Sequence, residues 1–200
     1  FWRKYIFSTD HKTIGIQYGI TALLFLFFGF SLMMVMRWQL AFPDQAVPVF
    51  GGLIKWLAEL NGFASNGNLP SDLYNVFGAM HGTIMIFLGV VPLVVGAFGN
   101  YVVPLQIGAP DMAFPKLNMT SYWVYFIGGV IMLVSFFLPG GAANSGWTSY
   151  PPLSVIATTG QTFWLLGMVF LITSSLLGSI NIIVTIIQLR APGLTWMRLP

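Results

Sequence analysis

The sequence predicts an all-α fold, a polytopic bundle of transmembrane helices with four spans. Two observations predict it: of 200 residues, 56% are hydrophobic and only 6% are charged, and the few charges leave long uncharged runs between them. A soluble domain has about 25% charged residues. A helix advances about 1.5 Å per residue, so roughly 20 apolar residues cross a lipid core about 30 Å thick. A bilayer is therefore the expected solvent for most of this chain.

The positions of charges and turns divide the chain into spans. No formal charge occurs between Lys116 and Arg190. This stretch is too long for one span, and the glycine-rich segment 139–146 is the turn that divides it. Pro92 should kink the second span, and 53–60 has the pattern of a short amphipathic surface helix. The four spans of the single domain 1–200 are expected over about 14–37, 73–101, 117–138 and 153–189.

The basic residues set the expected orientation. Those on one side of the spans outnumber those on the other: Arg3, Lys4, Lys12, Lys116, Arg190 and Arg198 against Arg37 and Lys55. Because cytoplasmic loops contain the excess of Lys and Arg, we expect the N-terminus on the cytoplasmic or matrix side, and we favour a bacterial plasma membrane over a mitochondrial one. The bilayer is an expected partner and nucleic acid is not. The absence of cysteine excludes disulfides, zinc–thiolate sites and iron–sulfur ligation from this segment.

His81 is the one histidine expected within a span. An ionisable ring at that depth needs a partner. Imidazole is a common ligand of haem iron, and a helix bundle can pack apolar side chains against a porphyrin. A hydrogen bond to a carbonyl or to water is the open alternative. Arg37 ends the first span on the same side, where it could reach a polar edge of a cofactor or extend to the lipid headgroups.

Polar side chains gather towards the opposite side of the expected bundle. Asp111 follows the second span, and the amides and hydroxyls near it belong to Asn100, Asn118, Ser121, Ser174 and Ser175. Such groups donate and accept hydrogen bonds, so they could order water into a proton path, although an ordinary loop also contains Asp. Trp147, in the loop before the fourth span, fits an interfacial aromatic belt as well as a donor to a carboxylate.

Six motifs follow one another along the chain. They are Phe7-Ser-Thr-Asp-His-Lys-Thr-Ile-Gly15, Tyr74-Asn75 with His81-Gly82, Gly99-Asn100 with Val103-Pro104-Leu105, Ile107-Gly-Ala-Pro-Asp-Met-Ala-Phe-Pro115, Gly146-Trp-Thr-Ser-Tyr-Pro-Pro-Leu153, and Ser174-Ser175 through Gly178 to Asn181. In this order they resemble the haem-copper oxidase superfamily and, within it, cytochrome c oxidase subunit I. The resemblance covers the whole chain and implies the N-terminal part of a larger subunit of about twelve spans.

The resemblance implies a haem site at one group of residues. By it, His81 is an axial ligand of the low-spin haem a, and Arg37 meets the formyl group of that haem. Trp147 lies near the propionates of a second haem, and Tyr74 belongs to the haem-binding motif. The second haem and a copper ion are expected in the complete subunit, with ligands outside this chain.

The same resemblance implies a proton pathway with Asp111 at its mouth. The positions that line it are Tyr18, Asn100, Asn118, Ser121, Ser174 and Ser175. Two residues depart from the family pattern: Met119 replaces a usual Asn, and Lys116 replaces a usual Arg. The first residue is not Met and a loop-like stretch leads to Pro200, so we expect a piece of a longer protein that is inactive alone.

The implied activity of the complete subunit is electron transfer from cytochrome c, through haem a, to a haem-copper centre that reduces oxygen to water, coupled to proton translocation. Expected partners are a copper-carrying subunit II, subunit III, cytochrome c and oxygen. Quinol-oxidising relatives place Arg, Asp and His where this chain has Phe28, Leu32 and Leu73, so cytochrome c is the preferred donor and quinol the alternative. A haem-free membrane transporter or channel is the alternative from another class.

Overall fold

The computed structural model describes residues 2–200, apart from the side chain of Arg3. Its elements in chain order are η1 (Trp2–Ile6), α1 (His11–Ala41), α2 (Gly51–Leu60), α3 (Ser71–Thr83), η2 (Ile84–Val90), η3 (Pro92–Gly99), α4 (Asn100–Ile107), α5 (Pro115–Val134), η4 (Ser135–Phe137), α6 (Leu153–Ile156), α7 (Thr159–Gln188) and η5 (Trp196–Arg198). Arg3, one of the basic groups used to predict orientation, has its side chain outside the described part.

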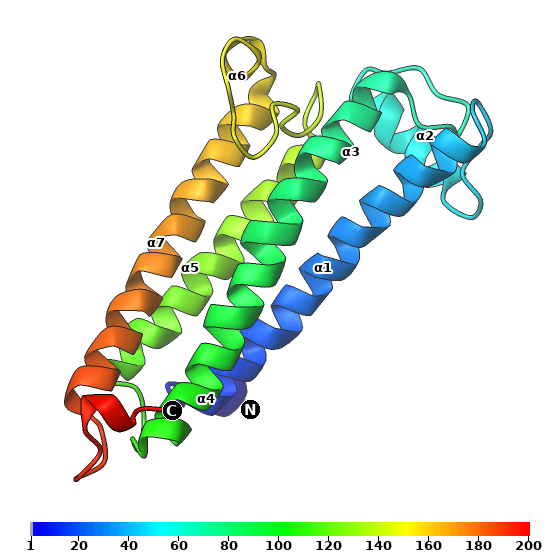
Figure 1. The fold of residues 1–200 in the computed structure, drawn as a ribbon. Coiled ribbons are helices and arrows are strands. Elements are labelled where there is room, and N and C mark those ends of the chain that lie inside the picture. Colours follow the sequence, from blue (N-terminus) through cyan, green and yellow to red (C-terminus); the bar gives the residue numbers. More distant parts are fainter. Residues whose placement is uncertain (1) are drawn as a thin grey trace. The chain divides into compact units, whose positions relative to one another are not determined.

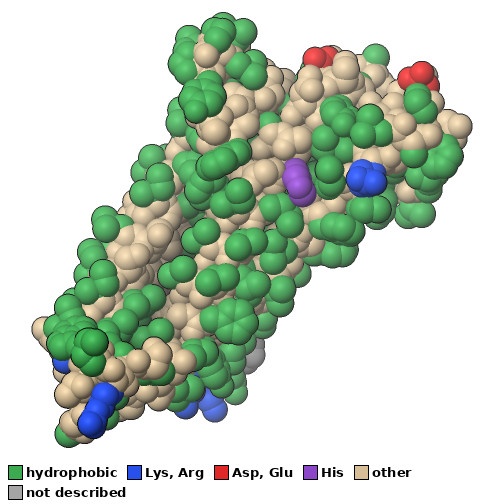
Figure 2. Space-filling model, in the orientation of Figure 1, with side chains coloured by type: hydrophobic (Ala, Val, Ile, Leu, Met, Phe, Trp, Pro, Cys, Tyr) green, Lys and Arg blue, Asp and Glu red, His purple; other side chains and the backbone are tan. Residues whose placement is uncertain are grey.

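Within residues 2–200, four helices are long and apolar enough to cross a membrane. They are His11–Ala41, Ser71–Ile107, Pro115–Phe137 and Thr159–Gln188. Hydrophobic side chains are spread over the whole face seen in Figure 2, and few charged side chains appear on it, as expected where lipid replaces water as the solvent. The predicted all-α, four-span fold class is confirmed.

The chain divides into two compact units, and every long helix contributes to both. The first unit comprises Phe1–Leu24, Phe87–Ile127 and Phe170–Pro200, and the second comprises Phe25–Ile86 and Gly128–Val169. In the first unit, the start of α1 and the segment after α7 both contact α4 (Figure 1): Nδ1 of His11 lies 2.9 Å from the carbonyl oxygen of Asn100, and the N–H of Ala191 donates to the carbonyl of Ile107 at 2.9 Å. Each unit contains one group of the predicted site residues, so the two groups are described separately.

Helix α1 begins at an aspartate cap. The Asp10 carboxylate accepts the backbone N–H of Thr13 at 2.8 Å and its hydroxyl at 2.9 Å, which satisfies one of the free donors at a helix start. Partial burial raises the pKa of the Asp10 carboxyl. The bonds from Thr13 and the neighbouring His11 and Lys12 outweigh that effect, so the pKa lies below its ordinary value of 3.8.

The second span contains two prolines, and proline has no N–H to donate to a carbonyl in the preceding turn. The helix is π-helical on both sides of Pro92, over Ile84–Val90 and Pro92–Gly99, where we expected a kink. The phenol of Tyr125 donates to the carbonyl of Leu88, four residues before Pro92, at 2.7 Å. A buried side chain thus donates a hydrogen bond to the backbone of the turn before Pro92.

The same device recurs at Pro104 within α4. Its counterpart four residues earlier is Asn100, whose carbonyl lies 2.9 Å from Nδ1 of His11. A carbonyl only accepts, so Nδ1 of His11 bears the proton. The His11 side chain is 2% exposed. In the first unit, α1 is therefore pinned to α4 by the carbonyl that Pro104 leaves free.

Helix α7 starts against the segment that follows η4. A β-bridge joins Ala142 to Gly160, and a Cβ atom on Gly160 would collide with the carbonyl oxygen of Gly141. Only glycine allows this approach. The fourth span was expected from 153 onwards, whereas the structure has the one-turn helix α6 at Leu153–Ile156 and then α7 from Thr159.

Candidate functional site

Hydroxyl groups from three helices meet in the first unit. The hydroxyl of Tyr18 on α1 lies 3.1 Å from Oγ of Ser121 on α5 and 3.2 Å from Oγ of Ser174 on α7. Ser121 donates to the carbonyl of Asn118 at 2.7 Å, and Ser174 donates to the carbonyl of Ser121 at 2.6 Å. Both serine protons are thus in use, so the one phenol proton of Tyr18 is shared between two serine oxygens.

Two asparagines beside this cluster have unpaired amide atoms. Asn118 is fully buried, and neither its Oδ1 nor its Nδ2 has a partner among the described residues. Asn100 donates from Nδ2 to the carbonyl of Gly96 at 2.6 Å, but its Oδ1 is buried and unpaired. A buried polar atom without a partner costs free energy, and ordered water commonly supplies the missing bond. The amides therefore fit a hydrated path.

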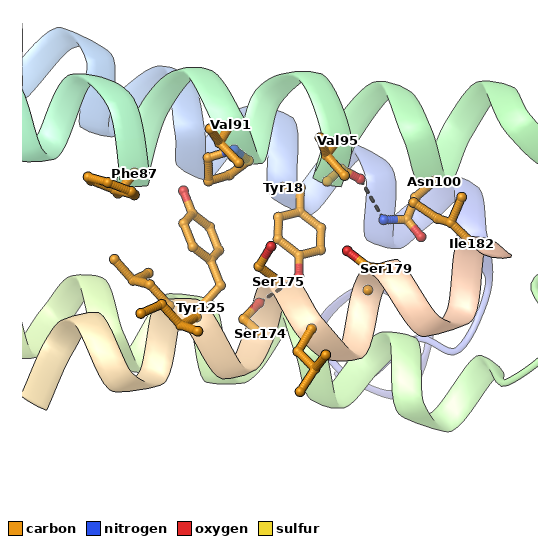
Figure 3. A pocket seen from close by; sticks show the side chains of 16 residues that line it. Tyr18, Phe87, Val91, Val95, Asn100, Tyr125, Ser174, Ser175, Ser179 and Ile182 are labelled. Atoms are coloured by element: carbon orange, nitrogen blue, oxygen red, sulfur yellow. Dashed lines mark hydrogen bonds between the residues drawn. The ribbon is translucent and has the colours of Figure 1, made fainter.

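A cavity of about 430 Å³ opens beside the cluster. Figure 3 shows how its polar lining is built, with Tyr18, Asn100, Ser174, Ser175 and Ser179 around one space. Four of these five are predicted pathway residues. Ser179 was not predicted. It lies on the same face of α7 as Ser175, one helical turn later, and this four-residue spacing is the signal that could have identified it.

Asp111 lies in the loop between α4 and α5, and its described contact is local. Its Oδ1 accepts the backbone N–H of Met112 at 2.7 Å, and the side chain is partly exposed. No hydrogen bond joins it to Asn100 or Asn118 within the described part of the chain. The structure thus places Asp111 in the same unit as the cluster, without a hydrogen bond to its asparagines among the described residues.

Two α7 residues that were not predicted as site residues hold this loop. The Asn181 amide accepts the N–H of Phe114 at 2.9 Å and donates to the Phe114 carbonyl at 3.2 Å. The Thr185 hydroxyl accepts the N–H of Ala113 at 2.9 Å and donates to the Asn181 carbonyl at 2.6 Å. Both side chains are fully buried. Their spacing of four among the isoleucine and valine residues near the end of α7 was the available signal.

His81 in the second unit is held by a backbone carbonyl. Its Nδ1 lies 2.8 Å from the carbonyl oxygen of Gly29 on α1. A carbonyl only accepts, so Nδ1 bears a proton, and in the neutral tautomer with that proton Nε2 has the lone pair. On the other side of the same turn, Nε1 of Trp164 donates to the buried hydroxyl of Thr83 at 3.1 Å. Two helices thus fix the orientation of the turn that bears His81.

Gly29 permits the approach that makes this bond. A Cβ atom there would lie 2.9 Å from Sδ of Met85 and 3.2 Å from Cγ2 of Ile84. A larger residue would have to displace the side chains of Met85 and Ile84. The arrangement suits a metal ligand, because ligating histidines usually donate their second N–H to a carbonyl or carboxylate.

The other predicted haem residues belong to the same unit. Trp147 is 51% exposed, and its Cδ1 lies 3.8 Å from the position of a Cβ on Gly82, the residue after His81. Tyr74 is partly buried on α3, two turns before His81. Arg37 is exposed, and the structure gives it no hydrogen bond or ion pair among residues 2–200. Of the three, Trp147 alone is shown against the turn of His81.

The sequence of this chain matches a known protein family. The family model described as "Cytochrome C and Quinol oxidase polypeptide I" matches residues 13–200. The chain belongs to this family. The prediction of an oxidase subunit I from the six motifs is confirmed, and haem and copper are the expected cofactors of the family.

Individual members of the oxidase family are similar to this chain in sequence. The chain is 46% identical to cytochrome c oxidase subunit 1 of Thermostichus vulcanus over its whole length, which is 32% of that protein. It is 40% identical to the subunit of the same name from Synechocystis, again covering 32% of it. A probable cytochrome c oxidase subunit 1-alpha of Streptomyces avermitilis is 40% identical, with 98% of this chain and 31% of that protein covered. The chain thus spans about a third of the relatives it matches.

Proposed function

We propose that this chain supplies part of the haem a site and the proton-uptake mouth of a proton-translocating cytochrome c oxidase. The complete protein would take electrons from cytochrome c and reduce oxygen to water at a haem-copper centre. The observation that carries this proposal is the bond between His81 and the Gly29 carbonyl, at 2.8 Å. With Nδ1 bonded in this way, the lone pair of Nε2 in the neutral imidazole is available to iron, and this is the form that binds the metal.

The haem side of the proposal uses residues of the second unit. His81 binds the iron of haem a through Nε2, and Gly29 holds the ring by its carbonyl. Arg37 meets a polar edge of the haem, and its lack of a protein partner among the described residues is compatible with that role. Tyr74 belongs to the haem-binding motif, and Trp147 lies near the propionates of the second haem. Haem a, when bound, supplies reversible one-electron transfer.

The proton side uses residues of the first unit. Asp111 collects protons at the mouth, because a carboxylate there can take up and release them. Water held by the unpaired amide atoms of Asn100 and Asn118 leads to the hydroxyls of Tyr18, Ser121, Ser174 and Ser175. A hydroxyl donates and accepts at the same oxygen, so a proton can pass along such a line without a charged side chain. Met119 adds no polar group where the family usually has one.

Cytochrome c is the proposed donor because three positions have apolar side chains. Phe28 packs edge-on against Phe136, with ring centroids 5.6 Å apart. Leu32 is 6% exposed and Leu73 is 1% exposed. Quinol-oxidising relatives place charged or ionisable groups at the positions of Phe28, Leu32 and Leu73, and here apolar side chains fill them. Turnover with quinol but not with reduced cytochrome c would overturn this choice of donor.

The proposed setting is a multi-subunit complex in a bacterial plasma membrane. The copper-carrying subunit II and subunit III are the proposed protein partners. The basic residues Lys4, Lys12, Lys116, Arg190 and Arg198 all belong to the first unit, which supports a cytoplasmic position for that unit and for the N-terminus. The relatives compared above come from bacteria, which supports the choice of membrane.

The test is a reduced-minus-oxidised optical spectrum of the full-length protein. The parent should show haem a bands, and His81→Leu should lose the low-spin haem without unfolding the bundle, because leucine suits an apolar span. Met80→Leu is the matched control. Met80 is fully buried on the same helix, and a swap of similar volume is tolerated. A parent without haem a bands would refute the oxidase function, and a His81→Leu variant with unaltered haem content would refute the ligand role.

A further inference from the structure

The loop that presents Trp147 is closed by one buried amide. Gln161 on the first turn of α7 is 4% exposed. Its Oε1 accepts the hydroxyl of Ser145 at 2.5 Å, and its Nε2 donates to the hydroxyl of Ser149 at 2.8 Å. The two serines bracket a five-residue turn with Trp147 at its centre. One side chain therefore joins both ends of the turn.

The backbone of this turn includes one residue in an unfavourable conformation. Ser149 has φ +53° and Gly146 has φ +73°. A left-handed conformation is ordinary for glycine but costs free energy at a serine, and it persists only where surrounding contacts determine it. The bond from Gln161 reaches Ser149 itself. The amide thus acts on the residue whose backbone is the least favourable in the turn.

The start of α7, which bears this amide, is attached to the segment before the turn. Gly160 forms the bridge to Ala142, and the hydroxyl of Thr158 donates to the carbonyl of Gly141 at 3.4 Å. The segment before the turn is therefore attached to the residues just ahead of Gln161. The turn then projects Trp147 to Gly82, where Cδ1 lies 3.8 Å from the position of a Cβ.

We infer that Gln161 is a positioning residue, which clamps the turn 145–149 and thereby sets the place of the Trp147 indole beside the His81 turn. This inference rests on the proposed function, in which Trp147 lies near the haem propionates. Gln161 itself touches no reacting group. Its amide is suited to the task because it offers one acceptor and one donor, and each serine hydroxyl can take the complementary role.

The test compares variants of the full-length holoenzyme by two readouts. Gln161→Leu keeps the volume and removes both bonds, and Gln161→Glu keeps the acceptor for Ser145 but loses the amide donor to Ser149. Gln188→Leu is the matched control, since Gln188 is an exposed residue of the same helix. The readouts are hydrogen–deuterium exchange of segment 141–152 and the propionate carboxylate bands in the reduced-minus-oxidised infrared difference spectrum.

Gln161→Leu should speed exchange in the turn by about tenfold or more, because two buried hydrogen bonds are lost, and should shift the propionate bands. Gln161→Glu should fall between it and the parent, and Gln188→Leu should match the parent. Unchanged exchange in Gln161→Leu would overturn the clamp, and faster exchange with unshifted bands would overturn the positioning of Trp147. If Gln161→Leu does not assemble, Ser149→Ala gives the same two readouts with one bond removed. A parent without haem bands would instead refute the proposed function.

Discussion

Replacing Gly96 by alanine should disturb the hydroxyl cluster through one methyl group. A Cβ on Gly96 would lie 2.6 Å from Cδ1 and 2.8 Å from Cγ of the Tyr18 ring. To reach an ordinary contact of 3.4 Å, the Cδ1 atom must move by about 0.8 Å. The ring has little room, because Tyr125 stacks on it and Tyr122 meets it edge-on, each with a centroid distance of 5.2 Å.

The consequence of this shift can be estimated from the hydrogen bonds of Tyr18. They measure 3.1 Å to Ser121 and 3.2 Å to Ser174, already longer than the usual 2.7–2.8 Å for O–H···O bonds. A displacement of about 0.8 Å should therefore break at least one of them. We expect Gly96→Ala to destabilise the protein by about 1–3 kcal/mol through overpacking, partly offset by about 1 kcal/mol from the helix propensity of alanine.

Gly178→Ala is the matched control for this prediction. Gly178 lines the same cavity, and a Cβ there would meet nothing within 4 Å. The assays are thermal unfolding of the full-length oxidase and the rate of proton uptake in a single turnover. Gly96→Ala should lower the unfolding temperature and slow uptake, and Gly178→Ala should do neither. Equal behaviour of the two variants in both assays would refute the assignment of Tyr18 to a tightly packed proton path.

Three further outcomes are expected. Asp111→Asn should slow proton delivery, because an amide cannot ionise at the channel mouth; unchanged turnover and pumping at neutral pH would contradict this role. Asn181→Leu removes both bonds to the Phe114 peptide and should speed amide hydrogen exchange in the loop 108–115. Exchange at the rate of the parent would count against the role of Asn181 in holding this loop. Asp10→Ala should cost about 1 kcal/mol at neutral pH through loss of the helix cap. The folded pKa of Asp10 lies below 3.8, so the contribution of the cap is present above about pH 3.8 and is lost as the pH falls through the folded pKa. The free energies of unfolding of parent and variant should therefore converge in acid. A difference that stays constant with pH would refute the cap.

Composition and charge placement were enough to predict the four spans, because the lipid core imposes a length and an apolar character on each helix. The family was equally accessible, because its motifs are local strings of residues. The amphipathic surface helix expected over 53–60 is α2, with Ile54 and Leu57 buried and Lys55 paired with Glu59 at 3.9 Å on its exposed side. These features depend on neighbours in the sequence and so can be read from it.

Only the tertiary structure identified the partners of particular atoms. Pro92 predicts a disturbed hydrogen-bond pattern from its sequence alone, but the side chain that donates to the backbone of the preceding turn is that of Tyr125, 33 positions after Pro92. Likewise, nothing local links His81 to Gly29 or Gln161 to Ser149, and the unpaired amide atoms of Asn118 are visible only once its surroundings are known. In a membrane the helices form independently of one another, whereas their pairing depends on close packing and on hydrogen bonds between distant segments, which a single sequence does not encode in any local pattern.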